Sequence, residues 1–181
     1  MKRRQLLGIC ALAGLSSACS TPIRRPGADS DGPWVQGRLL VRVAATAERG
    51  SVNESLVFEL RGSGNQGELH LSSPLGPRLA SARWAPGQAL LRRADSTTEL
   101  SFQNLDELSR QLLGETLPLA ALPDWLQGRP WPQASHQALA DGGFEQGGWR
   151  VLLTRRAEGW IEARRDAAPA VLLRVKLDDP S

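Results

Sequence analysis

Cysteine, histidine and tyrosine are scarce in this chain of 181 residues. It holds two cysteines, both within the first 19 residues, two histidines and no tyrosine. A disulfide framework or a cysteine-bound metal in the rest of the chain is therefore excluded. The sequence also has no phosphate-binding loop, no His-Glu-x-x-His motif and no Gly-x-Ser-x-Gly turn. It predicts no catalytic residue, no metal site and no cofactor, and so no enzyme.

The chain also lacks an excess of charge once its first residues are set aside. The formal net charge is +3, and Lys2, Arg3 and Arg4 supply all of it. Without the first 18 residues, 19 basic residues face 19 acidic ones, and they are spread along the chain. This distribution argues against nucleic acid as a partner, because nucleic-acid binding needs a clustered basic surface. The hydrophobic content of 41% is sufficient for a packed core.

Residues 1–18 have the pattern of a secretory signal peptide. A basic start precedes an apolar run over residues 6–15, which is too short to cross a bilayer, since crossing needs about 20 residues. The sequence Leu-Ser-Ser-Ala-Cys at residues 15–19 resembles a bacterial lipobox and predicts that Cys19 is lipidated and begins the mature protein. A plain signal peptide cut near Ala18 is the alternative, and both general and twin-arginine export remain open.

Residues 19–33 are predicted to form a lipidated flexible tether, because they are rich in proline and glycine and have no apolar periodicity. The fourteen residues after Cys19 span at most about 46 Å. A serine at position 20 resembles the sorting signal of lipoproteins destined for the outer membrane. The chain is therefore predicted to lie at the periplasmic face of the outer membrane, with one folded domain over residues 34–181.

The domain begins with apolar residues that alternate with polar ones. Val35, Leu39, Val41 and Val43 share one face of the first predicted strand, and the same alternation recurs over residues 56–61, 68–72 and 171–178. This pattern is typical of antiparallel strands with one face exposed to water. Turn residues rich in glycine, asparagine and proline separate the apolar runs.

Two short helices are predicted between the strands. Asn104 is a candidate N-cap with Glu107 as its partner three residues later, and Gly114 ends this first helix. The second helix is predicted over residues 119–127, where Pro123 either delays its start or bends it. Strands on both sides of two short helices predict a mainly β fold.

Four short motifs follow one another along the mature chain: Trp-Val-Gln-Gly-Arg-Leu at 34–39, Ser-Pro-Leu-Gly at 73–76, Trp-Leu-Gln-Gly-Arg-Pro at 125–130 and Gln-Gly-Gly-Trp at 146–149. These motifs in this order, preceded by a lipobox, resemble those of the LolB family of outer-membrane lipoprotein receptors. The resemblance implies an unclosed antiparallel β-barrel, or half-barrel, with a short helical lid over a hydrophobic cavity. It also implies a monomer that accepts acylated lipoproteins from the periplasmic carrier LolA. The receptor then inserts them into the inner leaflet of the outer membrane, without nucleotide.

The resemblance assigns roles to particular residues. Leu75 lies in a turn with Pro74 and Gly76 on either side, and the resemblance implies that this turn is a membrane insertion loop; an ordinary exposed leucine is the alternative. The predicted lipid cavity is lined by apolar residues of the strands and the lid. For each of them, ordinary packing in the core is an equally good explanation. These residues are Leu39, Val41, Leu56, Phe58, Leu69, Leu71, Trp84, Leu100, Phe102, Leu108, Leu112, Leu122 and Trp125.

Two other functions stay open at this stage. An outer-membrane lipoprotein of similar shape could hold another lipid or scaffold an envelope assembly. Deleting the gene separates this alternative from a general receptor, because only loss of a receptor should mislocalise many lipoproteins. An envelope hydrolase would need a catalytic cluster that the sequence does not contain.

Overall fold

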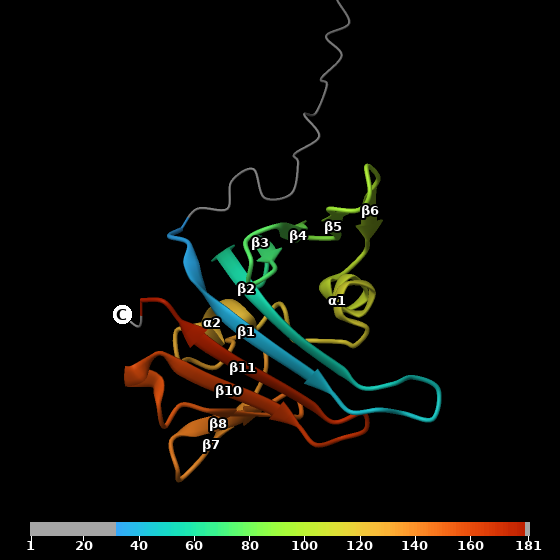
Figure 1. Cartoon of the computed structure of the whole chain (residues 1–181). Helices are drawn as coiled ribbons and strands as arrows, with labels where there is room; N and C mark the ends of the chain where they lie inside the picture. The colour runs from blue at the N-terminus through green and yellow to red at the C-terminus, as the bar shows by residue number, and fades with distance from the viewer. Residues whose placement is uncertain (1–31, 180–181) are drawn as a thin grey trace, which may run out of the picture.

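Eleven strands of residues 32–179, the part of the chain that the computed structural model describes, form one antiparallel sheet (Figure 1). Their order across the sheet is β6-β5-β4-β3-β2-β1-β11-β10-β9-β8-β7. The strands are β1 (Val35–Val43), β2 (Val52–Gly62), β3 (Gly67–Ser72), β4 (Arg78–Ala85), β5 (Gln88–Arg93), β6 (Glu99–Phe102), β7 (His136–Ala138), β8 (Gly143–Gln146), β9 (Trp149–Leu152), β10 (Trp160–Arg165) and β11 (Val171–Leu177). The predicted signal peptide, Cys19 and the predicted tether up to residue 31 lie outside the described residues.

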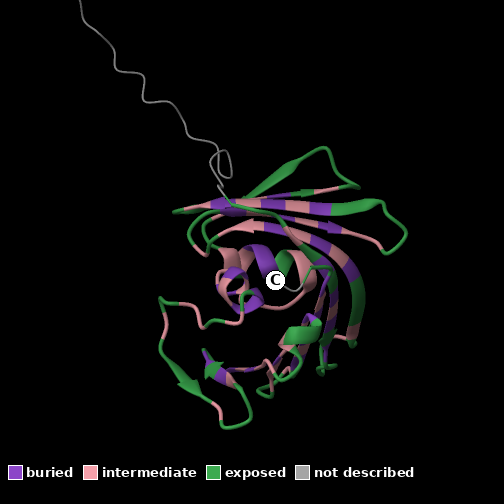
Figure 2. Cartoon of the chain, turned by 90° about the vertical axis from the view of Figure 1, so that its left-hand side faces the viewer, coloured by how far each residue is buried: buried purple, intermediate pink, exposed green. Residues whose placement is uncertain are grey.

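The sheet is curled but not closed. Its two edge strands, β6 and β7, are not hydrogen-bonded to each other, whereas β1 and β11 pair in the middle of the sheet. Between β6 and β7 the chain forms two helices, α1 (Leu105–Leu113) and α2 (Leu122–Leu126). The sheet curves around these helices (Figure 2). The predicted fold, an unclosed antiparallel half-barrel with a short helical lid, is confirmed.

The alternation read from the sequence sets which side chains face the lid. In β1, Leu39, Val41 and Val43 are buried while Arg38 and Arg42 between them are exposed. The buried positions of β2, β3 and β11 follow the same period of two. Each fully buried leucine or valine contributes about 1.5–3 kcal/mol, so the inner face of the sheet and the lid stabilise each other.

Two glycines allow a close approach inside the sheet. A Cβ atom at Gly37 in β1 would collide with the carbonyl oxygen of Lys176 in β11, and one at Gly67 in β3 would collide with the ring of Trp84 in β4. Gly37 belongs to the first of the four sequence motifs, so this part of the motif serves the pairing of β1 with β11.

The first lid helix begins and ends where the sequence predicts. The side chain of Asn104 accepts a hydrogen bond from the backbone N–H of Glu107 at 2.9 Å, and Gly114 ends the helix with φ of 74°. The carboxylate of Glu107 in turn accepts from the backbone N–H of Gln103 at 3.3 Å. These bonds satisfy backbone groups that a helix end leaves without partners.

The second lid helix is shorter than predicted. It covers Leu122–Leu126 rather than residues 119–127, with Pro123 in its first turn. The residues before it form tight turns, in which the backbone N–H of Ala121 donates to the carbonyl of Pro118 at 2.9 Å. A proline fits the first helical turn but not the interior of a helix. Pro123 therefore delays the start of this helix rather than bending it.

The short edge strand β7 is not among the strands that the sequence predicts. His136 begins the edge strand β7 and pairs with Gln146 of β8. The three residues of β7 are all exposed, so this strand has no buried face and no apolar alternation that could have revealed it.

Candidate functional site

A small apolar void lies beneath the lid. Its volume is about 20 Å³ and no polar residue lines it, so it is hardly larger than the space that one water molecule needs. The lining residues come from the sheet and from the lid: Leu39, Phe58, Leu60, Leu69, Leu71, Leu113, Leu117, Leu119, Leu122, Leu126, Leu173 and Val175. The lid therefore packs directly onto the inner face of the sheet in this arrangement.

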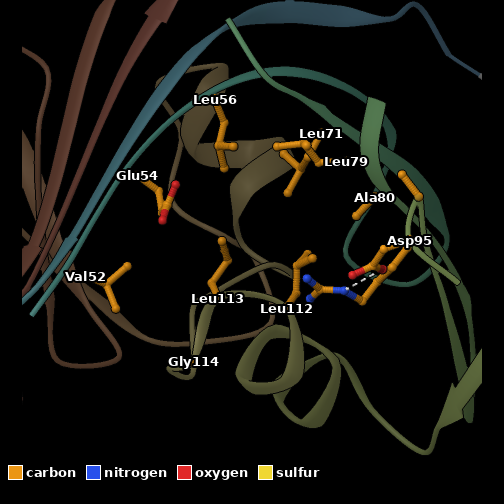
Figure 3. A pocket seen from close by; sticks show the side chains of 12 residues that line it. Val52, Glu54, Leu56, Leu71, Leu79, Ala80, Asp95, Leu112, Leu113 and Gly114 are labelled. Atoms are coloured by element: carbon orange, nitrogen blue, oxygen red, sulfur yellow. Dashed lines mark hydrogen bonds and ion pairs between the residues drawn. The ribbon is translucent and has the colours of Figure 1, made fainter. Parts of the chain in front are cut away.

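A larger open pocket adjoins this void. Its volume is about 450 Å³, within the range of roughly 300–1,000 Å³ typical of small-molecule sites. Leu112 and Leu113 at the end of α1 lie across from Leu56, Leu71 and Leu79 of the sheet (Figure 3). Leu71 and Leu113 line both the pocket and the void. These two side chains are therefore common walls of the two spaces.

The rim of the open pocket is polar. Glu54 of β2 lies on one side of the pocket and Asp95, two residues after β5, on the other (Figure 3). Arg93, the last residue of β5, also lines the pocket. The Nε atom of Arg93 lies 3.4 Å from Oδ1 of Asp95. A pocket with apolar walls and a charged rim suits a ligand that joins hydrocarbon to a polar group.

The predicted cavity residues divide into three sets. Those that line the open pocket or the small void are Leu39, Leu56, Phe58, Leu69, Leu71, Leu112 and Leu122. Those buried in the core outside both spaces are Val41, Trp84, Leu108 and Trp125. Leu100 and Phe102 of the edge strand β6 line neither space, and Leu100 is 37% exposed, because no further strand covers that edge.

Several lining residues were not predicted from the sequence: Val52, Leu79, Ala80, Leu113, Leu117, Leu119, Leu126, Leu173 and Val175. Leu173 and Val175 belong to a strand whose alternation was recognised, so the pattern alone could have included them. Leu117 and Leu119 lie in irregular chain between the helices, where no periodicity marks a buried face.

The turn that carries Leu75 is held by hydrogen bonds at its base. Backbone N–H groups of Gly76 and Ser73 donate to the carbonyls of Ser73 and Pro77 at 3.0 and 2.9 Å, and the N–H of Leu75 donates to Oγ of Ser73 at 3.3 Å. Pro74 fixes the first turn residue. Leu75 is 93% exposed on this ordered turn, so its apolar side chain projects into solvent.

This turn stands directly beside the open pocket. Residues 73–77 connect β3 to β4, and Leu71 and Leu79, two residues before and two after the turn, both line the pocket. The projecting leucine and the pocket mouth therefore lie at the same end of the half-barrel.

The second lid helix is fixed to the sheet through Gln146 of β8. The Oε1 atom of Gln146 accepts from the indole N–H of Trp125 and from the backbone N–H of Trp131, both at 2.9 Å. Its amide group donates to the carbonyls of Trp131 and Ala134 at 2.8 Å. All four hydrogen-bonding positions of this buried amide are used, so α2 is anchored in the core.

The link between the helices is held by charge. One oxygen of the Glu115 carboxylate lies 3.2 Å from Arg165 of β10, and the other lies 3.6 Å from Arg49 in the β1–β2 loop. Burial alone would raise the pKa of Glu115, but the backbone N–H of Thr116 and the two guanidinium groups outweigh it and hold that pKa below the ordinary 4.5. The end of α1 is thus fastened by partly exposed ion pairs rather than by a buried network.

Glu68 and His70 lie on the outer face of β3, away from the pocket. The ring of His70 lies 2.8 Å from Glu68 and 4.9 Å, centre to centre, from the ring of Trp34. Within residues 32–179 no cluster of three or more His, Cys, Asp or Glu side chains is arranged to hold a metal ion. None of the helices in that range has the length and apolar content needed to cross a membrane.

Fold and pocket together define a class of protein: a half-barrel with an apolar interior, covered by a helical lid and open at one end. A family model described as outer membrane lipoprotein LolB matches residues 35–174. The chain therefore belongs to the LolB family. Membership makes it an outer-membrane lipoprotein with a receptor role in the lipoprotein localisation pathway.

Individual relatives are similar to this chain over most of their length. The chain is 33% identical to outer-membrane lipoprotein LolB of Bordetella petrii, over 82% of this chain and 75% of the relative. It is 32% identical to the protein of that name in Chromobacterium violaceum, over 87% of this chain and 86% of the relative. The corresponding protein of Bordetella pertussis is 31% identical over 93% of this chain and 89% of its own length.

Proposed function

We propose that this chain is a monomeric, non-enzymatic receptor that accepts acylated lipoproteins from a LolA-like periplasmic carrier and inserts them into the inner leaflet of the outer membrane. The open pocket and the void beneath the lid receive the acyl chains, and the turn of residues 73–77 engages the membrane. Cys19 carries the lipid anchor, and residues 19–33 tether the domain. The observation that carries this proposal is an apolar pocket that shares its inner walls with the lid-covered void and opens beside Leu75.

The energetics require a protein that covers the chains. Three acyl chains contain some forty methylene groups, and at about 0.8 kcal/mol each their exposure to water would cost tens of kcal/mol. Crossing an aqueous space without a carrier is therefore negligible. Since the sequence contains no nucleotide-binding motif, transfer must follow graded affinity, from carrier to receptor to bilayer.

The filled interior implies that the lid moves during uptake. Displacing α1 and the link after it would expose Leu108, Leu112, Leu113 and Leu117, at about 1.5–3 kcal/mol for each side chain that is fully buried. That cost of several kcal/mol is smaller than the gain from covering three acyl chains. The buried Trp125–Gln146 bond keeps α2 in place, so α1 is the part of the lid that we expect to open.

One transfer experiment tests the proposal. The mature chain carrying Cys19→Ala, which cannot be lipidated, is mixed with a LolA-type carrier loaded with a lipoprotein, and the two proteins are then separated. We expect the lipoprotein to move to the receptor without added nucleotide. A cargo that stays on the carrier at every receptor concentration would contradict the proposed function.

A further inference from the structure

The start of β4 contains an extra residue, Leu79. Leu71 of β3 is paired with Ala80, but the next residue of β3, Ser72, is paired with Arg78. Leu79 therefore has no partner residue on β3, which is the arrangement of a β-bulge. Its carbonyl accepts a hydrogen bond from the backbone N–H of Ala94 at 2.9 Å instead.

The bulge changes the direction of the Leu79 side chain. Strict alternation from Ala80 would place Leu79 on the outer face of the sheet, with Ser81 and Arg83. Instead, Leu79 and Ala80 both line the open pocket, as Leu71 does (Figure 3). An irregularity in the strand thus adds an apolar side chain to the pocket mouth.

Leu79 differs from its neighbours in exposure. It is 42% exposed, whereas Leu56, Leu71 and Ala80 in the same pocket are 5% exposed or less. Part of Leu79 therefore contacts the pocket wall, and the rest remains open to solvent. It lies four residues after Leu75, so at most about 14 Å of chain separates them. Leu79 therefore lies between the covered interior of the half-barrel and the projecting turn that carries Leu75.

We propose that Leu79 is a second lipid-contacting residue, on which an acyl chain rests as it passes from the pocket to the membrane at Leu75. The inference rests on the proposed function and adds an exit path to it. An acyl chain that leaves the pocket along this path keeps an apolar contact at each step. Leu71 forms the inner wall, Leu79 the mouth and Leu75 the membrane end.

Contact between Leu79 and the acyl chain is tested with a fluorophore attached at one position of the protein. The mature chain carrying Cys19→Ala has no other cysteine, so L79C and the matched control L90C can each be labelled with one fluorophore. Leu90 lies on the neighbouring strand β5, is partly buried and lines no part of either apolar space. The probe is a triacylated lipopeptide whose acyl chains carry a nitroxide quencher. We expect quenching at L79C to exceed that at L90C about threefold, because only the former lies within contact distance.

The role in exit is tested with Leu79→Asn and Leu90→Asn. Each variant is loaded with fluorescent triacylated lipopeptide and mixed with vesicles of phosphatidylethanolamine and phosphatidylglycerol. Leu79→Asn should slow delivery about tenfold, because the polar amide interrupts the apolar path. It should slow uptake less, by about threefold, because Leu79 is only one of several residues in the pocket wall. Leu90→Asn should change neither rate. Leu79→Thr, a smaller change at the same site, serves if Leu79→Asn does not fold.

The outcomes separate the two proposals. Uptake by the Cys19→Ala chain with equal quenching at both positions, or with unchanged delivery by Leu79→Asn, would overturn the role of Leu79 alone. Equal slowing of uptake and delivery would make Leu79 an ordinary pocket wall and would also overturn it. No lipopeptide uptake by the Cys19→Ala chain itself would overturn the proposed function and the exit path together.

Discussion

Replacing Leu75 by glutamate should separate uptake of a lipoprotein from its delivery. Leu75 is 93% exposed and makes no core contact, so the free energy of unfolding should change by no more than about 0.5 kcal/mol. In a membrane the same change replaces a side chain that favours insertion by about 0.5 kcal/mol with a charged one that opposes it by about 2.5–3.5 kcal/mol. The difference of at least about 3 kcal/mol corresponds to membrane engagement that is weaker by roughly a hundredfold or more.

The assay follows both steps with the same protein. The mature chain carrying Cys19→Ala, with or without Leu75→Glu, is loaded from a LolA-type carrier and then mixed with vesicles that contain a fluorescence acceptor. We expect equal loading of both proteins. The rate at which the cargo enters the vesicles should fall by roughly a hundredfold or more in the Leu75→Glu variant.

A control separates the position from the charge. Thr97→Glu adds the same charge to the exposed loop between β5 and β6 and should deliver cargo at the normal rate. Normal delivery by Leu75→Glu would refute the role of this turn. Equal inhibition by Thr97→Glu would show that added charge, rather than the lost leucine, is responsible.

The remaining predictions concern the lid and the pocket. Gln146→Leu should lower the free energy of unfolding, measured in urea, by at least about 2 kcal/mol, because buried N–H and carbonyl groups lose their partners. Glu115→Gln should cost about 1 kcal/mol at pH 7. Because the pKa of Glu115 is lowered on folding, its contribution is present above pH 4.5 and disappears as the pH falls through the lowered pKa, so variant and wild type should converge in acid. Leu113→Asn should weaken lipopeptide affinity about tenfold in a fluorescence titration, and unchanged affinity would exclude Leu113 from the acyl path.

The elements that were predicted well are those set by local patterns. Alternating apolar residues marked β1, β2, β3 and β11, and the Asn104–Glu107 pair with Gly114 marked both ends of α1. Each of these signals depends on a few neighbouring residues. The general architecture then followed from the resemblance to a known family, with its helices between two sets of strands.

The details of the site depend on contacts between distant residues. Leu79 reaches the pocket because β4 is bulged against β3. The adjacent apolar residues Leu79 and Ala80 do not by themselves predict this bulge, because it depends on the pairing with β3. Gln146 joins Trp125 through a bond across 21 residues, so its buried role was not visible in the Gln-Gly-Gly-Trp motif. The small volume of the void beneath the lid depends on how leucines from seven elements and links interdigitate, which no single segment determines.

The central claim is that acyl chains enter between α1 and the inner face of the sheet. The most direct test is nuclear magnetic resonance of the mature chain carrying Cys19→Ala, bound to a triacylated lipopeptide with ¹³C-labelled acyl chains. We predict nuclear Overhauser contacts from the acyl methylenes to the methyl groups of Leu71 and Leu113, the two walls shared by the pocket and the void. Contacts confined to outer-face leucines such as Leu40 and Leu172, or no bound lipopeptide at all, would contradict it.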